Sequence, residues 1–190
     1  LTTSGRPLLN LTFAFNYAVS GPAPWSFHLL NLLVHGAAAF TLLAIIARTL
    51  RRTKLRAPIV AEAPWLAWAI ALLWALHPLQ VESVTYIVQR AESLAALFYL
   101  LTLYCFVRGS DSDASFGWLV GAWLACAAGV ATKETVATAP IVVLLYDRAF
   151  VAGTLWVALR SRWRFYLGLA ASWGLAGWLV CTGHSRGGTA

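Results

Sequence analysis

Methionine is absent from the 190 residues, and charged residues make up only 11% of them. Because no initiator methionine is present, we expect the chain to be a piece of a longer protein, so the lack of a signal peptide excludes nothing. The shortage of charge is informative in another way. A soluble domain of this length does not need so large an excess of apolar surface, which favours a membrane-embedded protein.

Cysteine is also scarce. Cys105, Cys126 and Cys181 are odd in number, and each lies inside an apolar run. Their spacing is not that of metal ligands. We interpret them as small apolar residues within helices, and we predict no metal site from them.

Apolar residues are abundant, at 60% of the chain, with ten tryptophans and a mean hydropathy of +0.71. This composition predicts an all-α fold, a polytopic transmembrane helical bundle with short interfacial helices. Pro140 makes the fifth predicted segment short or kinked. The six predicted membrane segments are Phe27–Ala47, Ala61–His77, Glu92–Val107, Phe116–Thr132, Thr135–Tyr146 and Phe165–Thr182.

The net charge of +7 comes from basic residues that cluster in short loops between the apolar runs. Such clusters follow the positive-inside rule, and we therefore reject a nucleic-acid partner. Ten of the fourteen Lys and Arg residues fall on one side, which we predict to be cytoplasmic. These ten are Arg48, Arg51, Arg52, Lys54, Arg56, Arg108, Arg148, Arg160, Arg162 and Arg164. The remaining four, predicted to be external, are Arg6, Arg90, Lys133 and Arg186.

Two regions follow from this topology. Residues 1–26 are predicted to form an external interfacial loop with one short amphipathic helix. Residues 27–190 are predicted to form the helical bundle, as part of a larger transmembrane domain.

The polar stretch from His77 to Arg90 lies between two apolar runs. Pro78 suits the first position of a helix, where its missing N–H is no loss. A helix over Leu79–Ala91 would place valines on one side, with Glu82 and Arg90 on the other. This pattern predicts a short amphipathic helix on the membrane surface.

Ionisable side chains gather on the predicted external side. Each one alone is more simply a solvated boundary residue than a functional one. Together, the basic members suit the phosphate of an anionic headgroup, and a nearby carboxylate suits the sugar or the acceptor. The candidate substrate-binding residues are Arg6, His77, Glu82, Arg90 and Lys133, with His28 and Glu134 as secondary candidates.

The first predicted segment carries His28, Asn31 and His35 on one helical face. For Asn31 and His35 we favour hydrogen bonding between helices over a site role. His28 lies near the outer boundary, within reach of a site. A metal site from His28, His77 and Glu82 is not required by any local spacing.

Several of these segments resemble a known family. The Arg6-Pro7-Leu8 segment, the helix from Trp25 to His35, and the stretch His77-Pro78-Leu79-Gln80-Val81-Glu82-Ser83-Val84 with Arg90 are similar to tetratricopeptide-containing transmembrane O-mannosyltransferases and their bacterial relatives. Lys133 and Asp147 also fit, and the resemblance covers roughly residues 5–150.

The resemblance implies a glycosyltransferase-C fold with its active site on the lumenal or periplasmic side. It implies transfer of a sugar from a polyprenyl-phosphate carrier to an acceptor hydroxyl on a protein or glycan, in the bacterial inner membrane or the endoplasmic reticulum membrane. The catalytic acid of the family is expected upstream of Leu1. The donor is then a lipid-linked sugar, and nothing in the sequence assigns a divalent metal.

Two alternatives stay open at this point. The presence of His77, Glu82 and Arg90 favours the enzyme, and the alternative is a non-catalytic membrane subunit of the same fold, which binds lipid or packs in a larger membrane complex. A channel or transporter fits less well, because the charges lie in loops and no matching pair of broken helices appears.

Overall fold

A computed structural model describes residues 6–52, 61–111 and 115–186 of the chain, and the described part is helical throughout. Lys54, Arg56 and the last four residues of the predicted outer tail lie outside the described residues. The α-helices are α1 Pro7–Ser20, α2 Pro24–Arg52, α4 Ala63–Ala75, α5 Val81–Thr85, α6 Arg90–Asp111, α7 Ser115–Val130, α8 Ala139–Asp147, α9 Leu155–Ser161 and α10 Trp163–Arg186. Short 3-10 turns cover Pro78–Gln80, Ile87–Gln89 and Glu134–Thr138, and a π-helical turn covers Arg148–Ala152.

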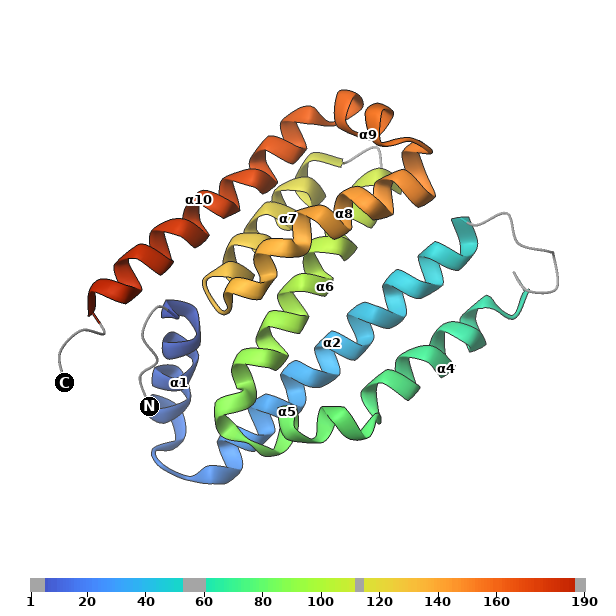
Figure 1. Ribbon diagram of the computed structural model, residues 1–190. Helices are drawn as coiled ribbons and strands as arrows, with labels where there is room; N and C mark the ends of the chain where they lie inside the picture. The colour runs from blue at the N-terminus through green and yellow to red at the C-terminus, as the bar shows by residue number, and fades with distance from the viewer. Residues whose placement is uncertain (1–5, 53–60, 112–114, 187–190) are drawn as a thin grey trace.

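The long helices lie alongside one another, with α6 between α2 and α7 (Figure 1). The short helix α1 lies at the end of the bundle where α2 and α6 begin, and α9 lies toward the opposite end. Glu92 and Asp111 mark these two ends of α6. We call them the Glu92 end and the Asp111 end.

Membrane-spanning length is reached by fewer helices than the sequence predicts. In the described part of the chain, Pro24–Arg52, Arg90–Asp111 and Glu134–Ala152 are long and apolar enough to cross a bilayer. A fourth span arises if Ala63–Ala75 and Pro78–Thr85, which meet at 54°, are counted together. The predicted segment Phe116–Thr132 corresponds to α7, which is apolar but shorter, and Phe165–Thr182 falls within α10. Six spans are therefore not confirmed, whereas the all-helical fold is.

Proline and glycine set several helix boundaries. α2 begins at Pro24, and α1, α4 and α8 each carry a proline in their first two positions, where no backbone N–H is needed. α1 is followed directly by Gly21, whose φ of 63° suits glycine and whose N–H donates to the Tyr17 carbonyl at 2.8 Å. The predicted short helix within residues 1–26 is thus α1.

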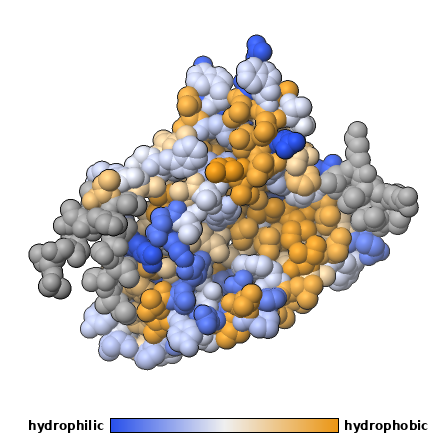
Figure 2. All heavy atoms as spheres, viewed as in Figure 1, coloured by the Kyte–Doolittle hydropathy of each residue, from blue (hydrophilic) through white to orange (hydrophobic). Residues whose placement is uncertain are grey.

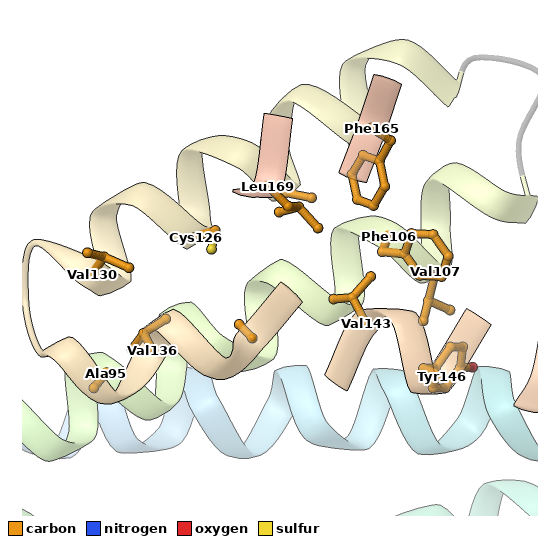
Figure 3. Packing of buried hydrophobic residues seen from close by; sticks show 12 residues of the cluster. Ala95, Phe106, Val107, Cys126, Val130, Val136, Val143, Tyr146, Phe165 and Leu169 are labelled. Carbon is orange, nitrogen blue, oxygen red and sulfur yellow. The ribbon is translucent and has the colours of Figure 1, made fainter. Parts of the chain in front are cut away.

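The main core joins α6, α7, α8 and α10 (Figure 3). Phe106 stacks on Phe165 with 5.4 Å between ring centroids, and Trp123 also stacks on Phe165, at 6.2 Å. The helices approach closely at glycines. A Cβ added at Gly168 would lie 2.4 Å from the Trp123 ring, so only glycine fits there without movement.

The outer surface is largely apolar, as expected for helices in lipid. Figure 2 shows broad apolar areas, with hydrophilic side chains gathered mainly in one patch. Exposed large apolar residues occur on α1, α2, α4, α7, α8, α9 and α10, whereas α6, which lies between α2 and α7, has none; among the exposed residues are Trp25, Trp65, Trp68, Trp156 and Trp178. Together with the spans, this surface shows that the chain is embedded in a membrane.

The predicted continuous helix over Leu79–Ala91 is wrong. α5 ends at Thr85, and Tyr86 is extended, with φ −93° and ψ 123°. A 3-10 turn follows before α6 begins at Arg90. The run Val84–Val88 is rich in β-branched residues, which have low helix propensity, so tertiary contacts decide its course.

Candidate functional site

The guanidinium of Arg90 lies fully buried where α1, α2 and α6 meet. Its Nε donates to Asn31 Oδ1 at 2.8 Å, and its Nη2 donates to Asn16 Oδ1 at 2.9 Å and to the Phe27 carbonyl at 3.1 Å. Nη1 points to the Thr12 carbonyl at 3.4 Å. The rings of Phe13 and Phe27 lie 4.7 and 5.4 Å from the guanidinium carbon. Within the described residues, Arg90 forms no ion pair with a carboxylate.

Asn31 uses both ends of its amide. While its oxygen accepts from Arg90, its Nδ2 donates to the Tyr86 carbonyl at 3.2 Å. One side chain of α2 therefore satisfies the backbone at the break between α5 and α6. Asn31 was expected to bond between helices, and it does so here.

This arrangement positions a polar cavity of about 440 Å³ on the opposite side of the break. Trp74 and His35 line it, with their rings stacked at 5.2 Å between centroids, and His35 Nε2 lies 3.0 Å from the Ala75 carbonyl. Ser93 donates to the Ser83 carbonyl at 3.0 Å and holds α5 against α6. The other polar side chains that line the cavity are Gln80, Glu82, Gln89 and Glu92.

A second cavity of about 460 Å³ adjoins the first. Trp74, Glu92 and Ala96 line both, so the two cavities adjoin, and we refer to them together as the cleft between α2, α4, α6 and the 3-10 turn Glu134–Thr138. The second part is mainly apolar, lined by residues such as Leu42, Leu100 and Val136. We call the two parts the polar chamber and the apolar chamber.

The turn between α7 and α8 brings basic and acidic groups to this cleft. The Lys133 ammonium donates to Glu92 Oε1, and Arg6 Nη2 lies 3.7 Å from Glu134 Oε1. The adjacent residues Lys133 and Glu134 therefore connect this turn to Glu92 of α6 and to Arg6, which precedes α1. The Lys133 side chain is 19% exposed and the Glu92 side chain 47%.

The predicted site residues divide into four groups. Glu82 lines the polar chamber, and Lys133 reaches it through Glu92. Arg6 and Glu134 pair beside it. The exposed His77 accepts the Leu79 N–H on Nδ1 at 3.2 Å as the cap of the Pro78 turn, and His28 is exposed on α2. Arg90 is two residues before Glu92, with its donors directed to protein oxygens. Phosphate binding by Arg90 stays a prediction.

Sequence reasoning did not single out Glu92, Trp74 or Gln89 as site residues. In the sequence Glu92 only marks the start of the predicted segment Glu92–Val107, and Trp74 is only part of the apolar run Ala61–His77. Glu92 contacts Lys133, and Trp74 contacts His35. Both partners lie far away in the chain, so no local pattern indicates these contacts. Because the helix is broken at Tyr86, the spacing of Glu82, Gln89 and Glu92 in the sequence does not predict that they line one cavity.

The chemistry available in the cleft is hydrogen bonding and charge pairing. The polar chamber offers carboxylate, amide and hydroxyl groups, which suit a polyhydroxyl ligand, while the apolar chamber suits a hydrocarbon chain. Within residues 6–52, 61–111 and 115–186, no three His, Cys, Asp or Glu side chains come close enough to hold a metal ion.

The apolar helices and the cleft between them define an integral membrane protein. Comparison with known proteins shows that it is a relative of the protein O-mannosyl-transferases. The chain is 34% identical over 158 residues to protein O-mannosyl-transferase TMTC2 of Homo sapiens, covering 77% of this chain and 17% of that protein. It is 39% identical over 158 residues to Tmtc2 of Drosophila melanogaster, with 77% and 16% covered. It is 34% identical over 115 residues to TMTC3 of Homo sapiens, with 60% and 11% covered.

The family resemblance predicted from sequence is therefore confirmed. The similarity to human TMTC2 covers 77% of the 190 residues, so the aligned part of the chain includes residues 50–140. Glu82, Glu92 and Lys133 lie within it. The chain spans about a sixth of the length of these curated relatives. No protein-family model and no solved structure matches the chain.

Proposed function

We propose that this chain is part of a membrane glycosyltransferase that takes a sugar, mannose by analogy with its relatives, from a polyprenyl-phosphate carrier. The acceptor is a hydroxyl group on a protein or glycan. The observation that carries this proposal is the cleft, in which a polar and an apolar chamber meet beside a lysine. A lipid-linked sugar has the same three parts, namely a polyhydroxyl ring, an anionic phosphate and a hydrocarbon chain.

The cleft assigns a role to each part of the donor. The sugar ring occupies the polar chamber, with Glu82 and the neighbouring amides as hydrogen-bond partners. The phosphate lies near Lys133, whose charge stabilises the leaving group as negative charge develops on it. The isoprenoid chain runs into the apolar chamber toward Leu100. The general base for the acceptor hydroxyl comes from the family's catalytic acid, expected upstream of Leu1.

The orientation in the membrane follows from the loops. Arg48 and Arg52 meet Asp111 at one end of α6, whereas Lys133 meets Glu92 at the other. The Asp111 end, which includes most of the predicted inner arginines, faces the cytoplasm under the positive-inside rule. The cleft then opens on the lumenal or periplasmic side, which agrees with the supply of polyprenyl-phosphate sugars there.

The proposal is tested by assaying the whole protein with a polyprenyl-phosphate mannose donor. Glu82→Gln and Lys133→Gln should each lower transfer at least tenfold while the protein stays in the membrane. Arg164→Gln, which removes one charge from an exposed position at the start of α10, is the matched control and should leave transfer unchanged. Transfer unaffected by both cleft variants would rule out the cleft as the donor site, whereas no transfer by the wild-type protein would favour a non-catalytic subunit of the same fold.

A further inference from the structure

Glu92 occupies the boundary between the two chambers. It lines both of them, and its carboxylate accepts from Lys133, which comes from the turn between α7 and α8. Lys133 forms no other ion pair within the described residues. The basic group best placed to meet an anion in the cleft is therefore neutralised by a carboxylate of the cleft itself.

The charge inside the polar chamber opposes an anionic ligand in this state. Glu82 and Glu92 both line the chamber, and Arg90 is turned to the other side of α6, where its donors are engaged. An incoming phosphate would meet two carboxylates before it met a free cation. For the phosphate to be held, the lysine has to leave Glu92.

The side chains have the freedom that such an exchange requires. Lysine carries a compact ammonium on a flexible stem with three rotatable donors, unlike the rigid fork of arginine. The pair is partly exposed, and partly exposed ion pairs contribute little to stability. The turn itself is held by the N–H groups of Thr132 and Lys133, which donate to the Gly129 carbonyl at 2.9 and 2.8 Å, and by the buried Val136, so the Lys133 side chain moves without loss of the turn.

We propose that Glu92 is a competing anion that occupies Lys133 when the cleft is empty and is displaced by the phosphate of an isoprenyl phosphate. Glu92 is thus a positioning residue that sets the affinity for the anionic part of the donor. This inference rests on the proposed function, because it takes the donor's phosphate as the displacing group. If Glu92 bound the donor directly, removal of its charge would weaken donor binding. As a competing anion, its removal strengthens binding.

The experiment measures the dissociation constant of farnesyl phosphate for the full chain in phosphatidylcholine nanodiscs. Glu92→Gln should bind about two- to fivefold more tightly than wild type, the range expected for release of a partly exposed ion pair. Lys133→Gln should bind more weakly. When Lys133→Gln is already present, adding Glu92→Gln should raise the affinity no more than adding Glu82→Gln, because no lysine is left to release.

Two further arms separate the sources of any change. Glu82→Gln removes a carboxylate from the same chamber without freeing a lysine, so its gain measures general charge relief, and the Glu92→Gln gain must exceed it. Inorganic phosphate lacks the chain that fills the apolar chamber and should compete only weakly. Equal or weaker binding by Glu92→Gln, with wild type binding normally, overturns the exchange alone. Absence of farnesyl phosphate binding in both wild type and Glu92→Gln overturns the proposed donor together with the exchange.

Discussion

Asn31 and Arg90 are joined by a hydrogen bond of 2.8 Å between two fully buried side chains that lie 59 residues apart in the chain. The bond links the first long helix to the start of α6. Asn31 also holds the Tyr86 carbonyl, so the pair fixes the break that separates Glu82 from Glu92. The buried cluster on one side of α6 thereby shapes the cleft on its other side.

Replacement of Arg90 should destabilise the bundle at the Glu92 end. Arg90→Ala leaves the two amide oxygens of Asn16 and Asn31 without their donor in a buried site, and we expect the free energy of unfolding to fall by about 3 kcal/mol. Arg90→Lys should be nearly as harmful, because a single ammonium does not reach Asn16 and Asn31 together. Thermal unfolding in detergent micelles measures the change.

The matched control is Arg51→Ala, which removes an exposed arginine from the last turn of α2. Its effect should be within about 0.5 kcal/mol of wild type. If Arg90→Ala were as stable as this control, the buried cluster would contribute nothing to packing, and a direct ligand role for Arg90 would gain support.

Asn31→Asp separates the two functions of the Asn31 side chain. The carboxylate still accepts from Arg90, but it has no donor for the Tyr86 carbonyl. We therefore expect global stability close to wild type, with faster amide hydrogen exchange over Val81–Arg90. Asn31→Ala, which loses both bonds, should lower global stability as well. Unchanged exchange in Asn31→Asp would show that other contacts hold the break.

The helical class and the approximate helix positions could be predicted from sequence, because hydropathy and proline act locally. The predicted segment Phe27–Ala47 lies inside α2, and Pro24 marks its beginning. The number of spans could not be predicted as well. α7 ends at Val130 and is followed by a turn and a 3-10 helix that continues into α8, a boundary that a run of apolar residues does not reveal.

The candidate site shows a similar division. The charged stretch around Glu82 is recognisable as a group from sequence; Glu82 lines the polar chamber, and Lys133 pairs with Glu92, which lines it as well. The burial of Arg90 could not be predicted, because its acceptors come from α1 and α2, and an arginine at a helix start ordinarily remains in solvent. The break at Tyr86 depends on the same distant amide.

Gly168 should not tolerate a side chain. A Cβ at this position would lie 2.4 Å from Trp123, whose indole Nε1 donates to the Phe165 carbonyl at 3.0 Å. Gly168→Ala would push the indole away from that bond, and we expect a loss of about 1–3 kcal/mol in the free energy of unfolding. Chemical or thermal unfolding in micelles reports the loss.

Gly174→Ala in the same helix provides the comparison, because nothing lies within 4 Å of a Cβ there. Its only effect should be the higher helix propensity of alanine, a gain of up to about 1 kcal/mol. The free energy of unfolding should therefore fall in Gly168→Ala and rise in Gly174→Ala. An unchanged value in Gly168→Ala would mean that α7 and α10 pack less closely than the structure shows.

Asp147 is fully buried at the end of α8 and ties this helix to the start of α10. Its carboxylate accepts from Arg162 Nη1 at 3.1 and 3.2 Å and from the Tyr166 hydroxyl at 2.7 Å. Arg162→Gln should be the most harmful single change, at about 3 kcal/mol, because it leaves a buried carboxylate without its cation. Tyr166→Phe removes one hydrogen bond and should cost about 1 kcal/mol.

The double variant Asp147→Asn with Arg162→Gln decides whether the pair acts as a unit. Removing both charges avoids an unpaired ion, so the double variant should be more stable than Arg162→Gln alone, and the two single effects should not add. Thermal unfolding of the four proteins in the same detergent completes the cycle. Strict additivity would mean that Asp147 and Arg162 do not interact, and that the turn over Arg148–Ala152 is held by apolar packing instead.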